Sequence, residues 1–128
     1  MAVTVTVDNG PSVQVDWTHG MNAQTALERA YSKINNSQRF TFGLQFFGQF
    51  GYLVTMFNET YDTFSNASAP YYYWEFFVNK HSMNRGIDSV LLNDGDRVSF
   101  SLELYVPEKH AGTTLAAKHK FRTTSKAG

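Results

Sequence analysis

Residues 2–34 decide the fold, and they read AVTVTVDNGPSVQVDWTHGMNAQTALERAYSKI. Around the turn at residues 8–11, β-branched and polar residues alternate with a period of two, which predicts a β-hairpin. From Ala23 to Ile34 apolar residues recur at steps of three and four behind Asn22, a good N-cap, which predicts a helix that ends near Asn35. The apolar stripe of this helix is narrow and rich in alanine, so we expect the helix to lie close on a sheet.

The rest of the chain returns to strand patterns. Apolar runs cover residues 40–46, 52–57, 71–78 and 98–104, and the last alternates most clearly. Polar stretches at residues 58–70 and 79–85 separate them and predict two loops. The order is strand, strand, helix and then about four strands. This grouping favours an α+β domain with a mixed sheet of about five to six strands packed on one helix.

The composition restricts the classes of function. A chain of 128 residues with 42% hydrophobic residues is one domain with an ample core. Eleven basic and eleven acidic residues cancel, which argues against a general nucleic-acid binder. No apolar run reaches about 18 residues, so we expect no membrane insertion. Because cysteine is absent, disulfides, zinc–thiolate sites and cysteine nucleophiles are excluded.

The composition changes after Tyr105. Residues 106–128 carry five basic residues against the single acidic Glu108, a net charge of +4. We therefore divide the chain into a domain at residues 2–105 and a basic C-terminal tail or arm at residues 106–128. Two interpretations of this tail stay open: a flexible terminus, or an arm that docks on an acidic partner or on a neighbouring subunit.

A search for catalytic patterns yields no candidate. The four histidines do not follow a metal-ligand spacing, and no Gly-x-Ser-x-Gly, GxGxxG or Walker motif occurs. The run Asn93-Asp94-Gly95-Asp96 lacks the further ligands of a calcium loop and predicts a turn instead. We expect no catalytic residues, no metal site and a protein that is not an enzyme.

Three Asn-x-Ser/Thr sequons fall in predicted loops or strand ends, where attached glycans would fit. Their acceptor residues are Asn35, Asn58 and Asn66.

The aromatic residues, 16% of the chain, exceed what one core face needs. If residues 71–78 alternate as a strand, one face carries Tyr71, Tyr73, Glu75 and Phe77, and the other carries Tyr72, Trp74, Phe76 and Val78. One face is core, and the other presents aromatic side chains outward, as contact surfaces do. The alternative is that the helix and the long loop cover that face too.

Residues 72–105, YYWEFFVNKHSMNRGIDSVLLNDGDRVSFSLELY, resemble the end of the transcobalamin C-terminal-like domain family. The matching positions are Tyr73-Trp74, Asn79, Gly86-Ile87, Leu92, Gly95-Asp96 and Val98. The resemblance extends over residues 2–105. It implies a β-grasp-like fold, in which a small mixed sheet cradles one helix, and a binding role without chemistry.

The same resemblance implies where such domains work. In vertebrate cobalamin carriers the domain closes over the corrinoid beside a large helical domain, whereas bacterial and archaeal members are secreted or displayed on the cell surface. We therefore expect an extracellular or cell-surface protein whose export signal has been removed. Two departures are the missing helical partner and Lys80, which replaces a glycine. A bound corrinoid is expected to face residues 80–85 and the neighbouring aromatic residues.

The sequence thus predicts a noncatalytic binding module for a protein or small-molecule partner. Its predicted binding residues are Tyr71, Tyr73, Trp74, Phe77, Lys80, His81, Ser82 and Met83. One alternative is a structural subunit, a homo-oligomer joined by strand or tail exchange at an edge strand such as residues 2–7. The other is a corrinoid-binding domain with cobalamin as its cofactor; otherwise we expect no cofactor.

Overall fold

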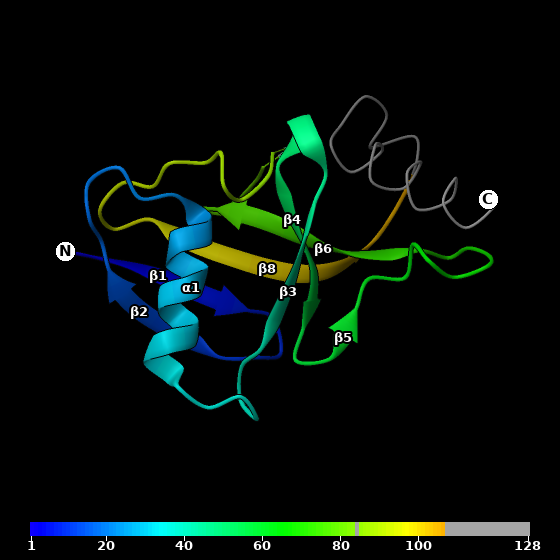
Figure 1. The fold of residues 1–128 in the computed structure, drawn as a ribbon, viewed down its shortest axis with the longest axis horizontal. Coiled ribbons are helices and arrows are strands. Elements are labelled where there is room, and N and C mark those ends of the chain that lie inside the picture. Colours follow the sequence, from blue (N-terminus) through cyan, green and yellow to red (C-terminus); the bar gives the residue numbers. More distant parts are fainter. Residues whose placement is uncertain (84, 107–128) are drawn as a thin grey trace.

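A computed structural model describes residues 1–83 and 85–106, and it contains one α-helix and eight strands in that part of the chain (Figure 1). In chain order the elements are β1 (Ala2–Val7), β2 (Ser12–Asp16), α1 (Ala23–Ile34), β3 (Phe42–Phe46), the 3-10 turn η1 (Gly48–Phe50), β4 (Tyr52–Phe57), β5 (Thr60–Tyr61), β6 (Tyr72–Val78), β7 (His81–Ser82) and β8 (Arg97–Leu104). In the part of the chain described, no helix is long and apolar enough to cross a membrane.

The strands form two sheets. Five strands make a mixed sheet in the order β2-β1-β8-β6-β7, in which β1 and β8 are parallel and the other pairs are antiparallel. The remaining three make an antiparallel sheet, β3-β4-β5, which crosses in front of the first sheet beside α1 (Figure 1). The predicted α+β class, with a mixed sheet packed on one helix, is confirmed. The second sheet was not expected, because strand periodicity does not say which strands pair.

The helix begins and ends at the predicted residues. The side chain of Asn22 caps it by accepting a hydrogen bond from the N–H of Thr25 at 2.8 Å. At the other end Asn35 adopts the left-handed conformation with φ of 47°. The stripe that faces the sheet consists of fully buried small residues and one leucine: Ala23, Ala26, Leu27 and Ala30. The predicted close packing of the helix on the sheet follows from these small side chains.

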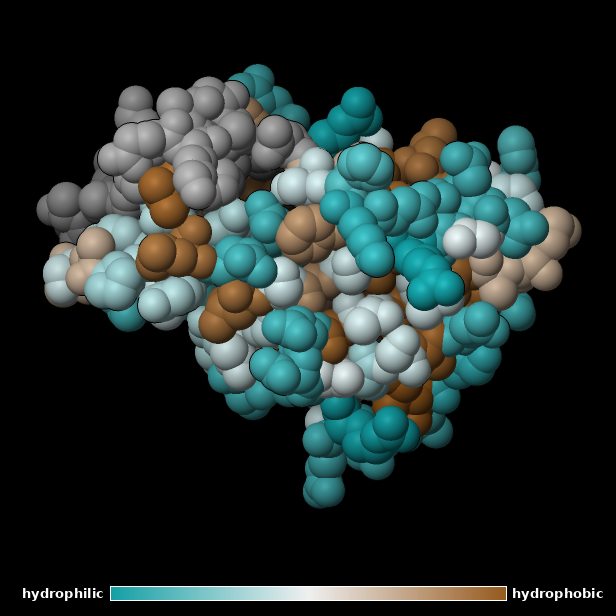
Figure 2. Space-filling view, turned by 180° about the vertical axis from the view of Figure 1, so that it is seen from behind, coloured by the Kyte–Doolittle hydropathy of each residue, from teal (hydrophilic) through white to brown (hydrophobic). Residues whose placement is uncertain are grey.

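The outer face of the five-stranded sheet points away from α1. Paired positions such as Thr4 with Arg97 and Thr6 with Ser99 carry polar side chains outward. Seen from that side, teal and white residues cover most of the surface, with separate brown patches (Figure 2). The sheet therefore has one apolar and one mainly polar face, as the alternation predicts.

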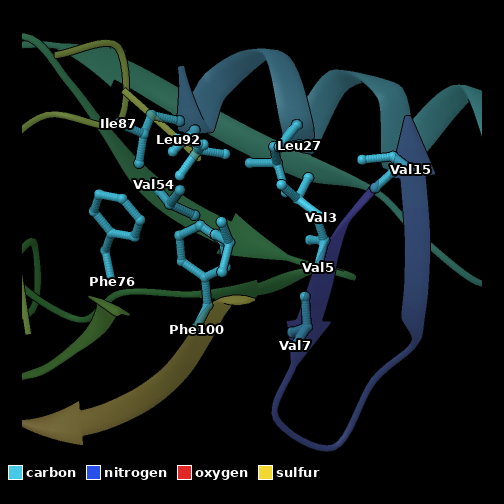
Figure 3. Packing of buried hydrophobic residues seen from close by; sticks show 14 of the residues in the cluster. Val3, Val5, Val7, Val15, Leu27, Val54, Phe76, Ile87, Leu92 and Phe100 are labelled. Atoms are coloured by element: carbon cyan, nitrogen blue, oxygen red, sulfur yellow. The ribbon is translucent and has the colours of Figure 1, made fainter. Parts of the chain in front are cut away.

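The core lies between the mixed sheet, the helix and the second sheet (Figure 3). Val3, Val5 and Val7 of β1 point into it and are at most 3% exposed. The ring of Phe100 lies 4.9 Å from that of Phe57 on β4 and 5.5 Å from that of Phe76 on β6, centroid to centroid. Aromatic residues thus fill the space between the two sheets, which accounts for much of the aromatic surplus.

One expectation about the sheet edges is wrong. Residues 2–7 form β1, which pairs with β2 on one side and with β8 on the other, so they are not an edge that can accept a strand. In the part of the chain described, the margins of this sheet are β2 and the two-residue β7. The tail at residues 107–128 lies outside the described residues, and the domain boundary at residue 105 stays a prediction.

Candidate functional site

Residues 72–78 of the aromatic run form β6, and their side chains alternate as predicted. Its partner β8 lies in antiparallel register, with Trp74 opposite Leu102 and Phe76 opposite Phe100. Phe76 belongs to the core, whereas Trp74 is half-buried. Of the predicted binding residues in β6, Trp74 therefore lies on the same face as Phe76, and Tyr73 and Phe77 lie on the outer face.

Tyr73 is buried on the outer face. It is 4% exposed, because the loop after β5 brings Phe64 over it and Tyr105 follows the end of β8. Half-buried Tyr71 packs on this second, small core. Burial, together with the hydrogen bond from its hydroxyl to Glu75, raises the pKa of Tyr73. The alternative that the long loop covers this face is correct here, so Tyr73 stabilises the fold and is not open to a ligand.

The neighbouring carboxylate of Glu75 is held by hydroxyl groups. Its Oε1 accepts hydrogen bonds from Tyr73 Oη at 2.8 Å and from Ser82 Oγ at 3.1 Å. Farther along this face, Ser101 Oγ donates to Glu103 Oε2 at 2.6 Å. These hydrogen bonds hold the two carboxylates in place on the outer face of the sheet, and the one from Ser82 joins β7 to β6.

The other predicted loop residues do not converge on one site. Asn79 and Lys80 form a tight turn with φ of 51° and 69°, and this leaves Lys80, His81 and Ser82 exposed. Met83 turns inward and packs against the main core. Phe77 is half-buried on the outer face, opposite Ser99.

Trp74 is a predicted binding residue that lines a hollow formed by several segments of the described chain together with a second aromatic ring, that of Phe57. It borders a groove of about 150 Å³ between the β1–β2 turn and the β4–β5 turn, hereafter the Trp74 groove. Nine residues line it: Val7, Asp8, Asn9, Gly10, Phe57, Asn58, Thr60, Trp74 and Leu102. The two turns lie side by side near the lower margin of Figure 1. Four separate segments therefore contribute to one hollow.

The floor of the groove is aromatic and rigid. The rings of Trp74 and Phe57 meet edge to face with centroids 4.9 Å apart. The indole Nε1 donates a hydrogen bond to the carbonyl of Thr60 at 2.9 Å, which fixes the ring on β5. Because this donor is occupied, the indole offers a ring surface rather than a hydrogen bond to a ligand.

The rim of the groove is polar and follows from turn chemistry. Asn9 and Asn58 both adopt positive φ, of 60° and 49°, which asparagine tolerates better than most residues. The side-chain carbonyl of Asn58 accepts a hydrogen bond from the N–H of Thr41 at 2.7 Å. A shallower hollow of about 320 Å³ adjoins the groove through Asn9, Gly10 and Asn58 and brings Arg39 to the same rim.

The sequence predicts Trp74 as a binding residue, but it does not predict the other residues that line the groove. Asp8, Asn9 and Gly10 were visible only as a turn signal, and Asn58 only as a sequon. Turn signals predict where the chain reverses, but they do not tell which two turns will be neighbours. The parallel pairing of β1 with β8 and the crossing of the second sheet create that proximity.

The other predicted features can be located as well. Asn93 and Asp96 close a turn by the hydrogen bond from Asn93 N–H to Asp96 Oδ2 at 2.8 Å, and Gly95 has φ of 88°, so the predicted turn is confirmed. The three sequon asparagines are exposed. Across the described residues, no group of three or more His, Cys, Asp or Glu side chains could hold a metal ion.

The chain matches known proteins at the level of a domain family and of its fold. A family model described as a domain of unknown function, DUF4430, matches residues 20–103. No curated protein matches the sequence significantly. Haptocorrin, crystallised in complex with Cbi, is similar with a TM-score of 0.67 and 18% identity over 83% of this chain. The match covers 25% of haptocorrin, so this chain spans about a quarter of that protein.

A second solved structure comes from Ruminococcus gnavus ATCC 29149 and is described as a "putative metal binding protein". Its TM-score is 0.51 with 16% identity, over 82% of this chain and 96% of that one. The predicted likeness to transcobalamin-like domains is thus confirmed for the fold. Both neighbours are described by what they bind and not as enzymes.

Proposed function

The chain belongs to the DUF4430 family, and we propose that it is a noncatalytic binding module. In this proposal the Trp74 groove holds a ring-shaped part of the partner. The coarser role, a binding module, has the support of the fold shared with haptocorrin. The finer assignment rests on one observation: an aromatic floor with a polar rim, assembled from four segments. Such a composition is typical of ligand sites.

The size of the groove limits what it takes. Sites for drug-sized ligands measure roughly 300–1,000 Å³, and the Trp74 groove measures about 150 Å³. One sugar ring or one planar side chain of a larger partner matches this space. The indole face of Trp74 supplies the apolar contact, and the side chains of Asp8, Asn9 and Asn58 supply acceptors and donors at the rim.

A place outside the cell is part of the proposal. It is supported by the exposure of all three sequon asparagines, Asn35, Asn58 and Asn66. Because Asn58 lines the groove, a glycan on it would cover the binding surface, whereas Asn35 and Asn66 do not line the groove. Mass spectrometry of glycopeptides from the native host shows which of the three asparagines carry glycans. We expect Asn58 to be unmodified in the protein that binds its partner. Full modification of Asn58 would contradict a role for the groove.

Cobalamin is the second candidate, favoured by the likeness to haptocorrin, which was crystallised with Cbi. The Trp74 groove by itself does not fit an enclosed corrinoid, since it is smaller than a site for a drug-sized ligand. Lys80 and His81, expected near such a ligand, are exposed at a turn. A corrinoid would therefore need a second domain or chain to complete its site.

Nitrogen-15 NMR titration of the full chain tests the groove, with a panel of monosaccharides, phenol and cobalamin as separate probes. We expect saturable shifts at the indole N–H of Trp74 and at the side-chain amides of Asn9 and Asn58. The variant Trp74→Leu should abolish them, while Trp17→Phe, at the chain's other tryptophan, should not. Saturable shifts on another surface only, or none with any probe, would overturn the assignment. Shifts with cobalamin at residues 80–82 would favour the second candidate.

A further inference from the structure

The margin of the five-stranded sheet at β2 has an unusual chemistry. The N–H of Val7 donates to the carbonyl of Pro11, and the N–H of Trp17 donates to that of Met1, which turns the odd-numbered residues of this segment toward β1. The backbone groups of Ser12, Gln14 and Asp16 therefore point away from the sheet. No strand covers them in the part of the chain that the structure describes.

Two cations from α1 occupy the carbonyl groups of this margin. Lys33 Nζ donates to the carbonyl of Gln14 at 2.6 Å, and Arg29 Nη1 donates to that of Asp16 at 2.8 Å. The outward N–H groups of Gln14 and Asp16 have no partner among the described residues. The carbonyls of Gln14 and Asp16 are thus satisfied, while the donors of this margin are open. Its two cations outnumber the one carboxylate of Asp16, so its net charge is positive.

Space for a further strand lies beside these cations. A hollow of about 500 Å³ is bordered by β2 and α1, and it is lined by Val15, Asp16, Thr18, Arg29, Ser32 and Lys33. In Figure 1 β2 lies at the margin of the sheet with α1 next to it. The hollow reaches Asp16, one of the two residues with a free donor, and both cationic side chains.

We propose that the β2 margin docks an extended acidic segment of a partner protein, which adds to the sheet as a strand. The carbonyl groups of that segment accept from the N–H groups of Gln14 and Asp16. Its N–H groups replace Lys33 and Arg29 at the two carbonyls. The released cations then pair with carboxylates of the same segment, so that the backbone groups of Gln14 and Asp16 and both cations keep a partner.

Charge selects this occupant over two others. The chain's own tail, with a net charge of +4, would bring like charge to Arg29 and Lys33. A second copy paired through β2 would bring its own Arg29 and Lys33 to the same margin. Cations beside a sheet edge oppose such self-pairing. An acidic segment removes the repulsion and gains two ion pairs.

The test uses the full chain and two matched peptides, acetyl-VEVEVEV-amide and acetyl-VKVKVKV-amide. With the Glu peptide we expect saturable NMR shifts and slowed hydrogen exchange at the amides of Gln14 and Asp16, both weakened by added salt. The Lys peptide should give neither. Equal binding of both peptides, or shifts confined to other residues, would overturn the proposal.

Variants separate strand addition from simple charge attraction. Gln14→Pro removes the outward N–H but no bond to β1, a position where an edge strand tolerates proline. It should weaken the Glu peptide about tenfold or more, as should Lys33→Glu, whereas Gln14→Val should bind normally. Thermal unfolding confirms that each variant folds, and normal binding by a folded Gln14→Pro would overturn strand addition.

Two further measurements separate this proposal from binding in the Trp74 groove and from self-association. Trp74→Leu should leave the Glu peptide's affinity unchanged, because the proposal does not depend on the Trp74 groove. A mass that doubles with concentration in light scattering, and that Gln14→Pro restores to the monomer value, would assign the margin to a second copy and overturn the acidic partner.

Discussion

The carboxylate of Asp88 accepts a hydrogen bond from the backbone N–H of Tyr52 at 2.9 Å, although 36 residues separate the two. The neighbouring N–H of Ile87 donates to the carbonyl of Tyr52 at 2.9 Å, and the carbonyl of Asp88 accepts from Asn22 Nδ2 at 3.0 Å. One short segment thus ties the start of β4 to the start of α1. These bonds help to place the second sheet, which carries Phe57 of the Trp74 groove.

Removal of the Asp88 carboxylate should loosen the second sheet. We expect Asp88→Ala to lower the free energy of unfolding by about 1–3 kcal/mol, because the N–H of Tyr52 loses its acceptor in a partly buried place. Asp88→Asn keeps a side-chain oxygen and should lose less. Urea unfolding followed by tryptophan fluorescence measures both, and equal losses would show that the hydrogen bond does not contribute.

Gly86 lies directly beneath this tie. A Cβ at this position would lie 2.7 Å from the carbonyl oxygen of Phe50 and 2.8 Å from the backbone nitrogen of Tyr52. Because both atoms belong to the backbone and cannot move aside, Gly86→Ala should cost about 1–3 kcal/mol. At Gly43 the nearest atom is a side-chain oxygen at 3.3 Å, so Gly43→Ala is the control with the smaller loss. A Gly86→Ala protein as stable as the control would contradict the packing.

The helix and the strand alternation could be predicted from sequence because they depend on neighbours in the chain. Asn22, the alanine stripe and Asn35 are local signals, and each has the expected role. The assignment of β3 and β4 to a second sheet could not be predicted in this way. Their alternation is the same as that of strands in the first sheet, and the bonds at Tyr52 and Asp88 that fix their place join distant segments.

The same limit applies to the site. The face on which Tyr73 lies follows from alternation, but its burial depends on Phe64, which comes from the mainly polar loop between β5 and β6. The Trp74 groove arises where Asn9 and Asn58, in two turns, meet. Local turn chemistry predicted both turns, whereas their proximity is a property of the whole fold.

The side chain of Asn22 caps the helix and also bonds to Asp88 in the segment between β7 and β8. Asn22→Ala should lower the free energy of unfolding by about 0.5–2 kcal/mol through the loss of the bond from Thr25 N–H. Asn22→Asp keeps this acceptor but cannot donate to the carbonyl of Asp88, so its loss measures the second contact alone. Urea unfolding gives both values. If Asn22→Asp were as unstable as Asn22→Ala, the cap itself would add nothing.

Tyr73 should make the fold sensitive to alkali. Its pKa in the folded protein is raised above the ordinary value of 10.0, mainly by burial and then by the hydrogen bond to Glu75. The unfolded chain therefore loses this proton first, and stability falls as the pH rises above about 10. Tyr73→Phe should show a smaller fall in the urea midpoint between about pH 8 and about pH 10.5. An identical fall in both proteins would contradict the burial of the hydroxyl.

Trp74 should be needed for its ring more than for its donor. Trp74→Phe removes the hydrogen bond to the carbonyl of Thr60 but keeps an aromatic floor, so we expect a loss of about 1 kcal/mol in stability and weakened binding in the groove. Trp74→Leu removes the aromatic surface and should abolish binding while the protein still folds. Thermal unfolding and the NMR titration measure the two effects separately. If Trp74→Phe and Trp74→Leu bound a probe equally well, the ring would not be a contact surface and the role of Trp74 would be to hold β5 against the sheet.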